Sequence, residues 1–414
     1  MNLFLSSMLS FVFFLSSCSE LPQQEGETHS EILSDEIDIL MSSSMHPDTS
    51  FSSRWSVTRT LLEGGRQEGV ELLTLNNGKL KIVVIPTRGM GILEVNMKEL
   101  RLGWDSPVKE VVHPSFINLD SRGGLGWLEG FNEWMVRCGL EFAGHPGTDE
   151  FLSNSGKKET RNLTLHGKIQ NIPASSYEVI VDSEEPHRIR IRGTVYESFF
   201  NGPKFSMVTE ISTIAGTDSF QISDLITNHG SLPQEFQLLY HGNYGSSILE
   251  EGASVHAPAK SVTPMNPHAA KYLDSWNKYR GPIPGFVEEV YLIDPLGDEN
   301  SSAFALLANR NKTQATSVRW NLNELPCLTI WKNTASPEDG YVTGIEPATS
   351  FPFNRLVERK YGRVPQLLPG ETRSFTLNFG IHLGKEAVDG LIEEASKRQM
   401  QSTLQLIPDP PSTK

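Results

Sequence analysis

The feature of this chain that most constrains its fold is a long succession of short apolar segments with turn residues between them. Between residues 54 and 384, segments of strand length recur, and glycine, asparagine and proline stand at their ends. In RIRIRGTVYE at 188–197, Ile189 and Ile191 share one face and the arginines the other, which is the period of a half-buried strand. At 76–78, Asn-Asn-Gly separates two such segments, and these residues tolerate the positive φ of a hairpin turn. The pattern predicts an all-β fold.

Further segments continue this pattern toward the C-terminus, and only KEAVDGLIEEASKRQM at 385–400 is typical of a helix. Many strands and few helices indicate one large antiparallel β-sandwich with a C-terminal helix, which spans 54–400 and precedes a flexible tail at 401–414. Loops at 103–135 and 260–300 are long for a compact domain, which is typical of functional loops or lids. The other strand segments are FSMVTEISTIAGTDSFQISDLITNHG, SAFALLANR, PCLTIWKN, GYVTGIEP and TRSFTLNFGIHL.

The N-terminus has the pattern of an export signal. Its apolar stretch from Met8 to Leu15 is too short to span a membrane and suits the core of a signal peptide, although no Lys or Arg precedes it. The stretch ends in Leu-Ser-Ser-Cys, which resembles a bacterial lipobox. We therefore expect a signal peptide at 1–18 and a lipid on Cys18, which make the protein an exported lipoprotein of a bacterial membrane, either periplasm-facing or in the outer membrane. An ordinary cleaved signal with a chance cysteine remains the alternative.

Charge is distributed unevenly along the chain. Of the 50 Asp and Glu residues eight precede Arg54, whereas none of the 36 Lys and Arg residues do. The segment 19–53 is therefore predicted to be an acidic, disordered tether. The remaining body is nearly balanced in charge and has no basic cluster, which argues against nucleic acid as a partner. The oligomeric state does not follow from the sequence.

Common cofactor and metal motifs are missing from the sequence. Cys138 and Cys327 are the only cysteines after Cys18, and no Cys/His spacing suits zinc. The GGLGWLEG segment at 123–130 does not have the spacing of a dinucleotide-binding loop, and no G-x-S-x-G elbow occurs. We expect no metal and no cofactor.

A histidine stands in an apolar strand segment, EFQLLYHGNYG at 235–245, just before glycine-rich sequence. Such an imidazole can fill space, bind a metal or move a proton. Alternation places Leu239, His241 and Asn243 on one mixed face with Gln237, which suits a binding surface better than a core. We therefore predict that Asn243 contacts a ligand beside His241.

A carboxylate and two further polar residues stand in similar places. Glu346 follows an apolar segment and precedes a proline, which is expected to end the strand and to leave the carboxylate projecting from it, unless Arg355 neutralises it. His166 follows a polar loop, and Arg88 ends an apolar strand before a glycine. Each of these residues has a structural explanation as well, so no single one identifies a site.

Together these segments resemble the galactose mutarotase-like superfamily, in particular its branch of aldose 1-epimerase-related proteins of unassigned substrate. The resemblance implies a large β-sandwich that binds a monosaccharide or sugar derivative. It implies that His241 protonates the ring oxygen and that Glu346 accepts the proton of the anomeric hydroxyl. It also implies that Arg88 and His166 bind the sugar and that Trp331 packs against it. The matching segments are TRGMGILEV, GWDSP, RCGLEFAGHPGTD, LHGKIQNIPA, TNHGSLPQEFQLLYHGNYG, TIWKN and GIEPATSFPFN.

Three functions remain open from the sequence. The first is an aldose 1-epimerase, whose proton transfers need only an imidazole and a carboxylate, and a carboxylate near His241 is expected to raise its pKa. The second is a tethered carbohydrate-binding protein without catalysis, because a fold does not fix a function. The third is a polysaccharide lyase or a glycosidase, and a second carboxylate near Glu346 would favour the glycosidase.

Overall fold

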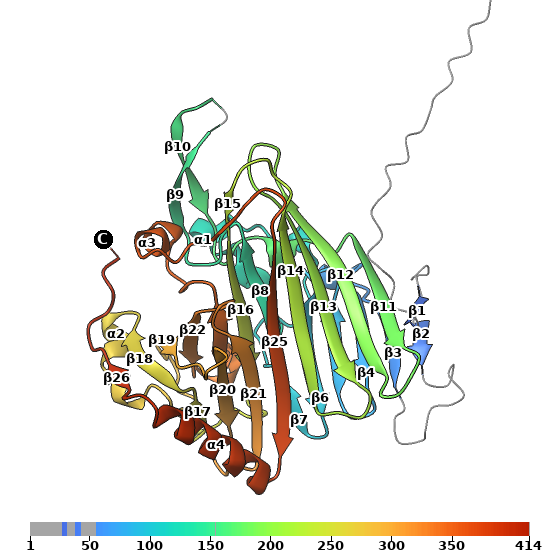
Figure 1. Ribbon diagram of the computed structural model, residues 1–414, viewed down its shortest axis with the longest axis vertical. Helices are drawn as coiled ribbons and strands as arrows, with labels where there is room; N and C mark the ends of the chain where they lie inside the picture. The colour runs from blue at the N-terminus through green and yellow to red at the C-terminus, as the bar shows by residue number, and fades with distance from the viewer. Residues whose placement is uncertain (1–26, 31–37, 43–54, 154, 414) are drawn as a thin grey trace, which may run out of the picture.

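The computed structural model describes residues 27–30, 38–42, 55–153 and 155–413. Within them the strands form two large sheets, which Figure 1 shows as green and red strands in front of blue ones. The predicted antiparallel β-sandwich is confirmed. The signal peptide predicted at 1–18 with its lipidated Cys18, and most of the tether predicted at 19–53, lie outside the described residues.

The first sheet contains nine strands among the described residues. The alternating segment at 188–197 forms one of its long strands, and the segments on either side of Gly216 form the next two. The order of the sheet is β1 (Glu27–Ser30), β11 (Ser176–Asp182), β12 (Arg188–Ser198), β13 (Lys204–Ile214), β14 (Ser219–Asn228), β25 (Thr372–Leu383), β21 (Gln314–Asn321), β20 (Ser302–Ala308) and β17 (Ser254–His256).

The second sheet contains thirteen strands of the described part of the chain. Its central strands β8, β16 and β23 are buried along their whole length, because the first sheet covers one face and loops cover the other. The order is β2 (Asp38–Ser42), β3 (Ser56–Leu61), β4 (Glu71–Asn76), β5 (Lys81–Ile85), β6 (Gly91–Met97), β8 (Met135–Leu140), β16 (Gln237–Tyr244), β23 (Val342–Ala348), β22 (Cys327–Asn333), β19 (Glu289–Pro295), β18 (Ala259–Pro264) and β26 (Gln405–Leu406), and β7 (Leu100–Leu102) pairs with β6.

The remaining elements are short apart from one helix. The hairpin of β9 (Gly147–Leu152) and β10 (Lys158–Leu163) projects beyond the sandwich at the top of Figure 1, and β15 (Gln234–Glu235) pairs with β24 (Gln366–Leu367). The other helices are α1 (Ser121–Gly124), α2 (Pro267–Ala270), α3 (Arg355–Lys360) and the 3-10 turns η3 (Gly65–Gln67), η4 (Pro114–Phe116), η5 (Gly126–Gly130), η6 (Ile169–Asn171), η7 (Leu273–Ser275) and η8 (Pro337–Asp339).

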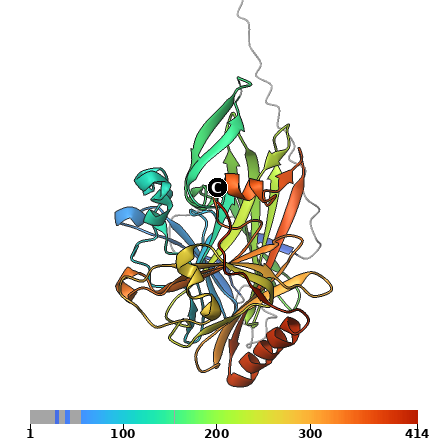
Figure 2. The same ribbon diagram turned by 90° about the vertical axis from the view of Figure 1, so that its left-hand side faces the viewer.

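Helix α4 (Lys385–Gln399) is the helix predicted from the sequence. It lies beside β20 and β21 at one end of the first sheet, as Figures 1 and 2 show, and it buries Val388 and Ala395 against Phe304 and Ala315. No helix in the described part of the chain is long and apolar enough to cross a membrane.

Strand β16 has two apolar faces that belong to different cores. Leu238 and Tyr240 lie in the large core between the two sheets. Leu239 lies in a smaller core on the outer face of the second sheet, together with Trp127 and Phe131. The predicted separation of the two faces is therefore confirmed, and the face that carries His241 is the one turned away from the main core.

Both ends of the chain contain more structure than the sequence led us to expect. In the segment predicted as a disordered tether, β1 pairs with β11 and β2 pairs with β3. The prediction is wrong there because the apolar side chain of Met41 in β2 is buried in the main core. In the tail predicted as flexible, β26 pairs with β18, since the sheet edge offers free backbone groups.

Two predicted boundaries are also corrected. The expected loop at 260–300 contains β18 and β19, so the true loop runs from 265 to 288. Strand β16 runs past His241 and through the glycine to Tyr244. Strand β23 continues through Pro347, which pairs with Leu328, because a proline removes one donor and leaves its carbonyl free to pair.

Candidate functional site

A cavity of about 180 Å³ lies on the outer face of the second sheet. Strands β16, β19, β22 and β23 contribute to it, and the two long loops noted in the sequence supply further walls. The first loop supplies Leu125, Trp127, Leu128 and Phe131, and the second supplies Glu288. The cavity is lined by Leu125, Trp127, Leu128, Phe131, His145, Leu165, His166, His241, Glu288, Val290, Thr329, Trp331, Glu346 and Pro352.

Strand register brings His241 and Glu346 together. Gly242 of β16 pairs with Ile345 of β23, so the preceding His241 lies opposite the following Glu346 in this antiparallel pair. His241 Nε2 is 3.3 Å from Glu346 Oε1, and both side chains are buried. Two residues that the sequence suggested separately, more than a hundred positions apart, therefore form one pair.

Aromatic rings enclose this pair. The ring centroid of His241 lies 5.4 Å from Phe131, 5.5 Å from Trp331 and 6.2 Å from Trp127. The ring of His166 is also 5.4 Å away and nearly perpendicular to it. These walls leave the pair almost fully buried and lower the local dielectric constant, which strengthens electrostatic effects between the two side chains.

Burial determines where the proton of the pair resides. Burial raises the pKa of Glu346 well above its ordinary value, and the charge of Glu288 raises it further. Burial lowers the pKa of His241 to about 4, against the opposing effect of a hydrogen bond with Asn243. The pKa of His241 is therefore lowered and not raised as expected, because desolvation of the imidazolium is the largest effect on it. These two shifts favour the neutral form of each side chain, in which the proton of the pair resides on Glu346.

His166, which the sequence analysis expects to bind the sugar, lines the cavity beside His241 and Glu346. Its Nδ1 lies 2.9 Å from the carbonyl oxygen of Ala143, which can only accept, so Nδ1 carries hydrogen and Nε2 does not in the neutral ring. Burial lowers the pKa of His166 well below the ordinary value, and His241 adds to the effect. His166 also has a φ of 58°, a left-handed conformation that a side chain of this kind rarely adopts.

Trp331 also lines the cavity, where the resemblance places it. Its ring meets that of His241 nearly edge-on, and its Nε1 donates to Glu288 Oε2 over 2.8 Å. Because a carboxylate has a second oxygen, Glu288 keeps Oε1 as an acceptor at the rim of the cavity. Arg355 does not neutralise Glu346, since its guanidinium bonds to Glu235.

Arg88 and Asn243, both predicted to bind ligand, lie outside the cavity lining. The guanidinium of Arg88 is buried and donates to the Glu133 carboxylate and to two backbone carbonyls. The side chain of Asn243 is fully buried behind His241, where its Oδ1 lies 2.7 Å from His241 Nδ1. The structure places neither side chain on the cavity wall, because the folded chain already uses their polar groups.

Sequence reasoning missed several lining residues. Trp127 and Leu128 belong to the GGLGWLEG segment, which was compared only with a dinucleotide-binding loop. Thr329 occupies a buried position in β22. Trp127 Nε1 and Thr329 Oγ1 are buried and have no hydrogen-bond partner among the described residues, and Glu346 Oε1 has only its 3.3 Å contact with His241 Nε2. Unpaired buried polar atoms are rare in folded proteins, so these atoms are available to a ligand that enters the cavity.

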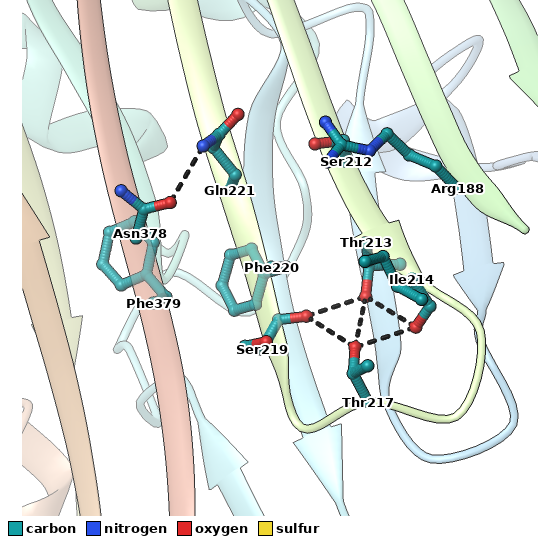
Figure 3. A pocket seen from close by; sticks show the side chains of 10 residues that line it. All are labelled: Arg188, Ser212, Thr213, Ile214, Thr217, Ser219, Phe220, Gln221, Asn378 and Phe379. Atoms are coloured by element: carbon teal, nitrogen blue, oxygen red, sulfur yellow. Dashed lines mark hydrogen bonds between the residues drawn. The ribbon is translucent and has the colours of Figure 1, made fainter. Parts of the chain in front are cut away.

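Figure 3 shows a second cavity, of about 200 Å³, between β13, β14 and β25. Its polar groups already bond to one another, since Gln221 donates to Asn378 and Thr213 donates to the Ser219 carbonyl. Its lining contains no histidine and no carboxylate, so it has no acid–base pair comparable to His241 and Glu346. Within the described residues, no group of three or more His, Cys, Asp or Glu side chains is arranged to hold a metal ion.

Comparison with known proteins gives a consistent result. Residues 67–381 match the family described as a domain of unknown function, DUF4432. The chain is 39% identical to a protein from Klebsiella pneumoniae that is provisionally described as an aldose 1-epimerase, with a TM-score of 0.87 over 94% of this chain and 99% of that chain. A search of curated proteins gave no match.

More distant structures share the fold. A galactose mutarotase-like protein from Clostridium acetobutylicum is 15% identical, with a TM-score of 0.52 over 78% of this chain and 97% of that chain. A galactose 1-epimerase from Lactobacillus acidophilus is 12% identical, with a TM-score of 0.50 over 79% of this chain and 99% of that chain. At these identities the likeness shows the fold alone.

Proposed function

Because the chain belongs to the DUF4432 family and has a galactose mutarotase-like fold, we propose that it interconverts the anomers of an aldose. The observation that carries the proposal is the pair of His241 Nε2 and Glu346 Oε1, 3.3 Å apart in an aromatic cavity. The description of the Klebsiella relative as a provisional aldose 1-epimerase supports it.

The reaction needs one proton donor and one proton acceptor on a short O5–C1–O1 span, and no electrons leave the sugar. With the resting proton on Glu346, this residue gives it to the ring oxygen while His241 Nε2 takes the proton of the anomeric hydroxyl. The O5–C1 bond breaks and C1=O1 forms. Rotation about C1–C2 and the reverse transfers close the ring as the other anomer. These roles are the reverse of those implied by the family resemblance.

This protonation state predicts the acid limb of the pH profile. A second proton removes the base only below the pKa of His241 near 4, and loss of the acid requires a pH well above the ordinary glutamic acid range. The enzymatic rate, corrected for spontaneous and buffer-catalysed exchange, should therefore not fall on the acid side until the pH approaches 4. An acid limb with its half-maximal rate near the ordinary imidazole value of about 6.5 would contradict this expectation.

The unpaired atoms predict ligand hydrogen bonds. Trp127→Phe keeps a ring beside Phe131 and His166 but removes the N–H, and Thr329→Val removes only a hydroxyl. Each change should weaken binding of the most rapidly exchanged aldose by about threefold to tenfold, the contribution of one hydrogen bond, in a calorimetric titration.

The control for these two variants is Trp276→Phe. It changes a buried indole outside the cavity and should leave the affinity for the aldose unchanged. Unchanged affinity in both cavity variants would show that neither atom meets the ligand.

One observation favours a second candidate, glycoside cleavage. Glu288 lines the same cavity as Glu346, and two carboxyl groups about a glycosidic bond are what most glycosidases use. Saturation-transfer NMR between α and β anomers of a panel of aldoses, run beside hydrolysis of aryl glycosides, separates the candidates. Faster exchange without hydrolysis supports the epimerase, whereas hydrolysis supports the glycosidase. Binding with neither reaction would leave a carbohydrate-binding protein.

The N-terminal sequence supports a further proposal, that Cys18 carries a lipid and tethers the domain to a bacterial membrane. Membrane fractionation of cells tests it. The wild-type chain should sediment with membranes and a Cys18→Ala variant should appear in the soluble fraction, and equal sedimentation of the two would contradict the anchor.

A further inference from the structure

The two ring nitrogens of His241 have different surroundings. Nε2 faces Glu346 at 3.3 Å on the cavity side, and Nδ1 lies 2.7 Å from Asn243 Oδ1 on the buried side. A neutral imidazole carries one hydrogen, and which nitrogen holds it decides whether the ring can accept a proton at Nε2.

Hydrogen bonds fix the orientation of the Asn243 amide. Its nitrogen donates to the carbonyl oxygen of Glu133 over 3.0 Å and to that of His241 over 3.1 Å. Both carbonyls can only accept, so the amide nitrogen must face them and Oδ1 must face the imidazole. Since Oδ1 is also an acceptor, Nδ1 of His241 has to carry the hydrogen.

The support behind this amide is itself held in place. Asn243 is fully buried in β16, and its backbone N–H donates to Trp134 O over 2.6 Å. The carboxylate of Glu133 accepts from Arg88 over 2.5 Å and from Gln170 over 2.7 Å. Arg88 therefore holds Glu133, whose carbonyl oxygen in turn accepts from Asn243.

We propose that Asn243 is a positioning residue that locks His241 in the Nδ1–H form, so that Nε2 alone exchanges a proton with the ligand. The catalytic consequence of this positioning rests on the proposed function. The position of the hydrogen on the His241 ring is a property of the protein without ligand. An amide suits this task because it accepts from Nδ1 without bringing a charge. A carboxylate there would stabilise the imidazolium and compete with Glu346 for the proton.

Among the polar groups around the ring, Asn243 contacts Nδ1, whereas protonated Glu346 faces Nε2 and favours the same tautomer. His241 meets Glu346 of β23 and the ring of His166, which follows β10. His241 also lowers the pKa of His166, so a charge on His241 disfavours a charge on His166. Neither of these groups contacts Nδ1, whose partner is the Asn243 oxygen.

Long-range ¹H–¹⁵N correlation NMR of ¹⁵N-histidine-labelled protein tests the proposal, with the His241 signals assigned by their loss in His241→Gln. The wild type should show a protonated Nδ1 and an unprotonated Nε2. In Asn243→Leu the hydrogen should move wholly or partly to Nε2, and anomer exchange should fall by about tenfold to a hundredfold. A wild-type ring protonated at Nε2, or an unchanged ring in Asn243→Leu, would overturn the proposal.

Asn243→Asp is the conservative variant and serves if the leucine variant does not fold. It should keep hydrogen on Nδ1 and move the acidic limb of the pH–rate profile upward from pH 4 toward neutrality, since the new carboxylate stabilises the imidazolium. Asn228→Leu is the matched control, because it removes another fully buried amide, which bonds to Leu232 O and Leu367 O, and should leave the His241 signals unchanged. The predicted tautomer without anomer exchange in the wild type would refute the proposed function and leave the positioning intact.

Discussion

Replacement of Glu346 by glutamine is expected to slow anomer exchange by about 10²–10⁴-fold, the usual contribution of one positioned proton donor. The two side chains have nearly the same shape, so the cavity walls and the contact with His241 are retained. An amide is no substitute for the carboxylic acid, because it cannot release a proton to the ring oxygen. Affinity for the sugar should change far less than the rate, which separates a catalytic from a binding role.

Saturation-transfer NMR gives the exchange rate, and calorimetry on the same preparations gives the affinity. Glu386→Gln, which removes an exposed carboxylate at the start of α4, is the matched control and should behave as the wild type. A Glu346→Gln variant that retains at least a third of the wild-type rate would exclude Glu346 as the acid.

The same experiment extends to His241. His241→Gln should cause a loss of similar size, because the base is removed while a polar side chain remains. Since Glu346 and His241 share one proton and act as a unit, the double variant should be hardly slower than either single one. Losses that multiply in the double variant would show that the residues act independently, which the 3.3 Å contact does not predict.

Local sequence pattern was sufficient to predict the fold class and to single out His241 and Glu346. The alternation in β12, the turn residues between β4 and β5 and the helical segment α4 are short-range signals, and each produced the expected element. His241 and Glu346 stood out because each is an ionisable residue within an apolar strand segment. Their apposition follows from the pairing of β16 with β23, which no local pattern encodes.

The errors arose where long-range contacts decide the outcome. Arg88 resembled a ligand-binding residue, but Glu133, from a distant loop, occupies its guanidinium. Asn243 shares the face of His241, yet its polar atoms turn to the buried side. Trp127 lies in a glycine-rich loop without periodicity, so only the fold reveals that it lines the cavity. The direction of the His241 pKa shift was misjudged because burial depth, which lowers this pKa, is a tertiary property.

The largest loss of stability is expected at a buried ion pair that joins the two sheets beneath the site. Arg137 of β8 donates from Nε and from its terminal nitrogen to the two carboxylate oxygens of Asp224 in β14, over 3.0 and 3.2 Å. Tyr240 of β16 donates to the same carboxylate over 2.7 Å. Neither charged side chain reaches solvent. Removal of one charge therefore leaves the other buried without a counter-charge.

Asp224→Asn should lower the free energy of unfolding by about 3–5 kcal/mol, the usual cost of breaking a buried pair from one side. Urea denaturation followed by tryptophan fluorescence measures it. Asp218→Asn is the matched control, because it breaks an exposed bridge to Lys79 and should cost at most about 1 kcal/mol. The double change Arg137→Met with Asp224→Leu should recover much of the loss, since two apolar side chains leave no buried charge. If the double variant is as unstable as Asp224→Asn, the cost arises from lost packing, and the ion pair is not what holds the sheets in register at this point.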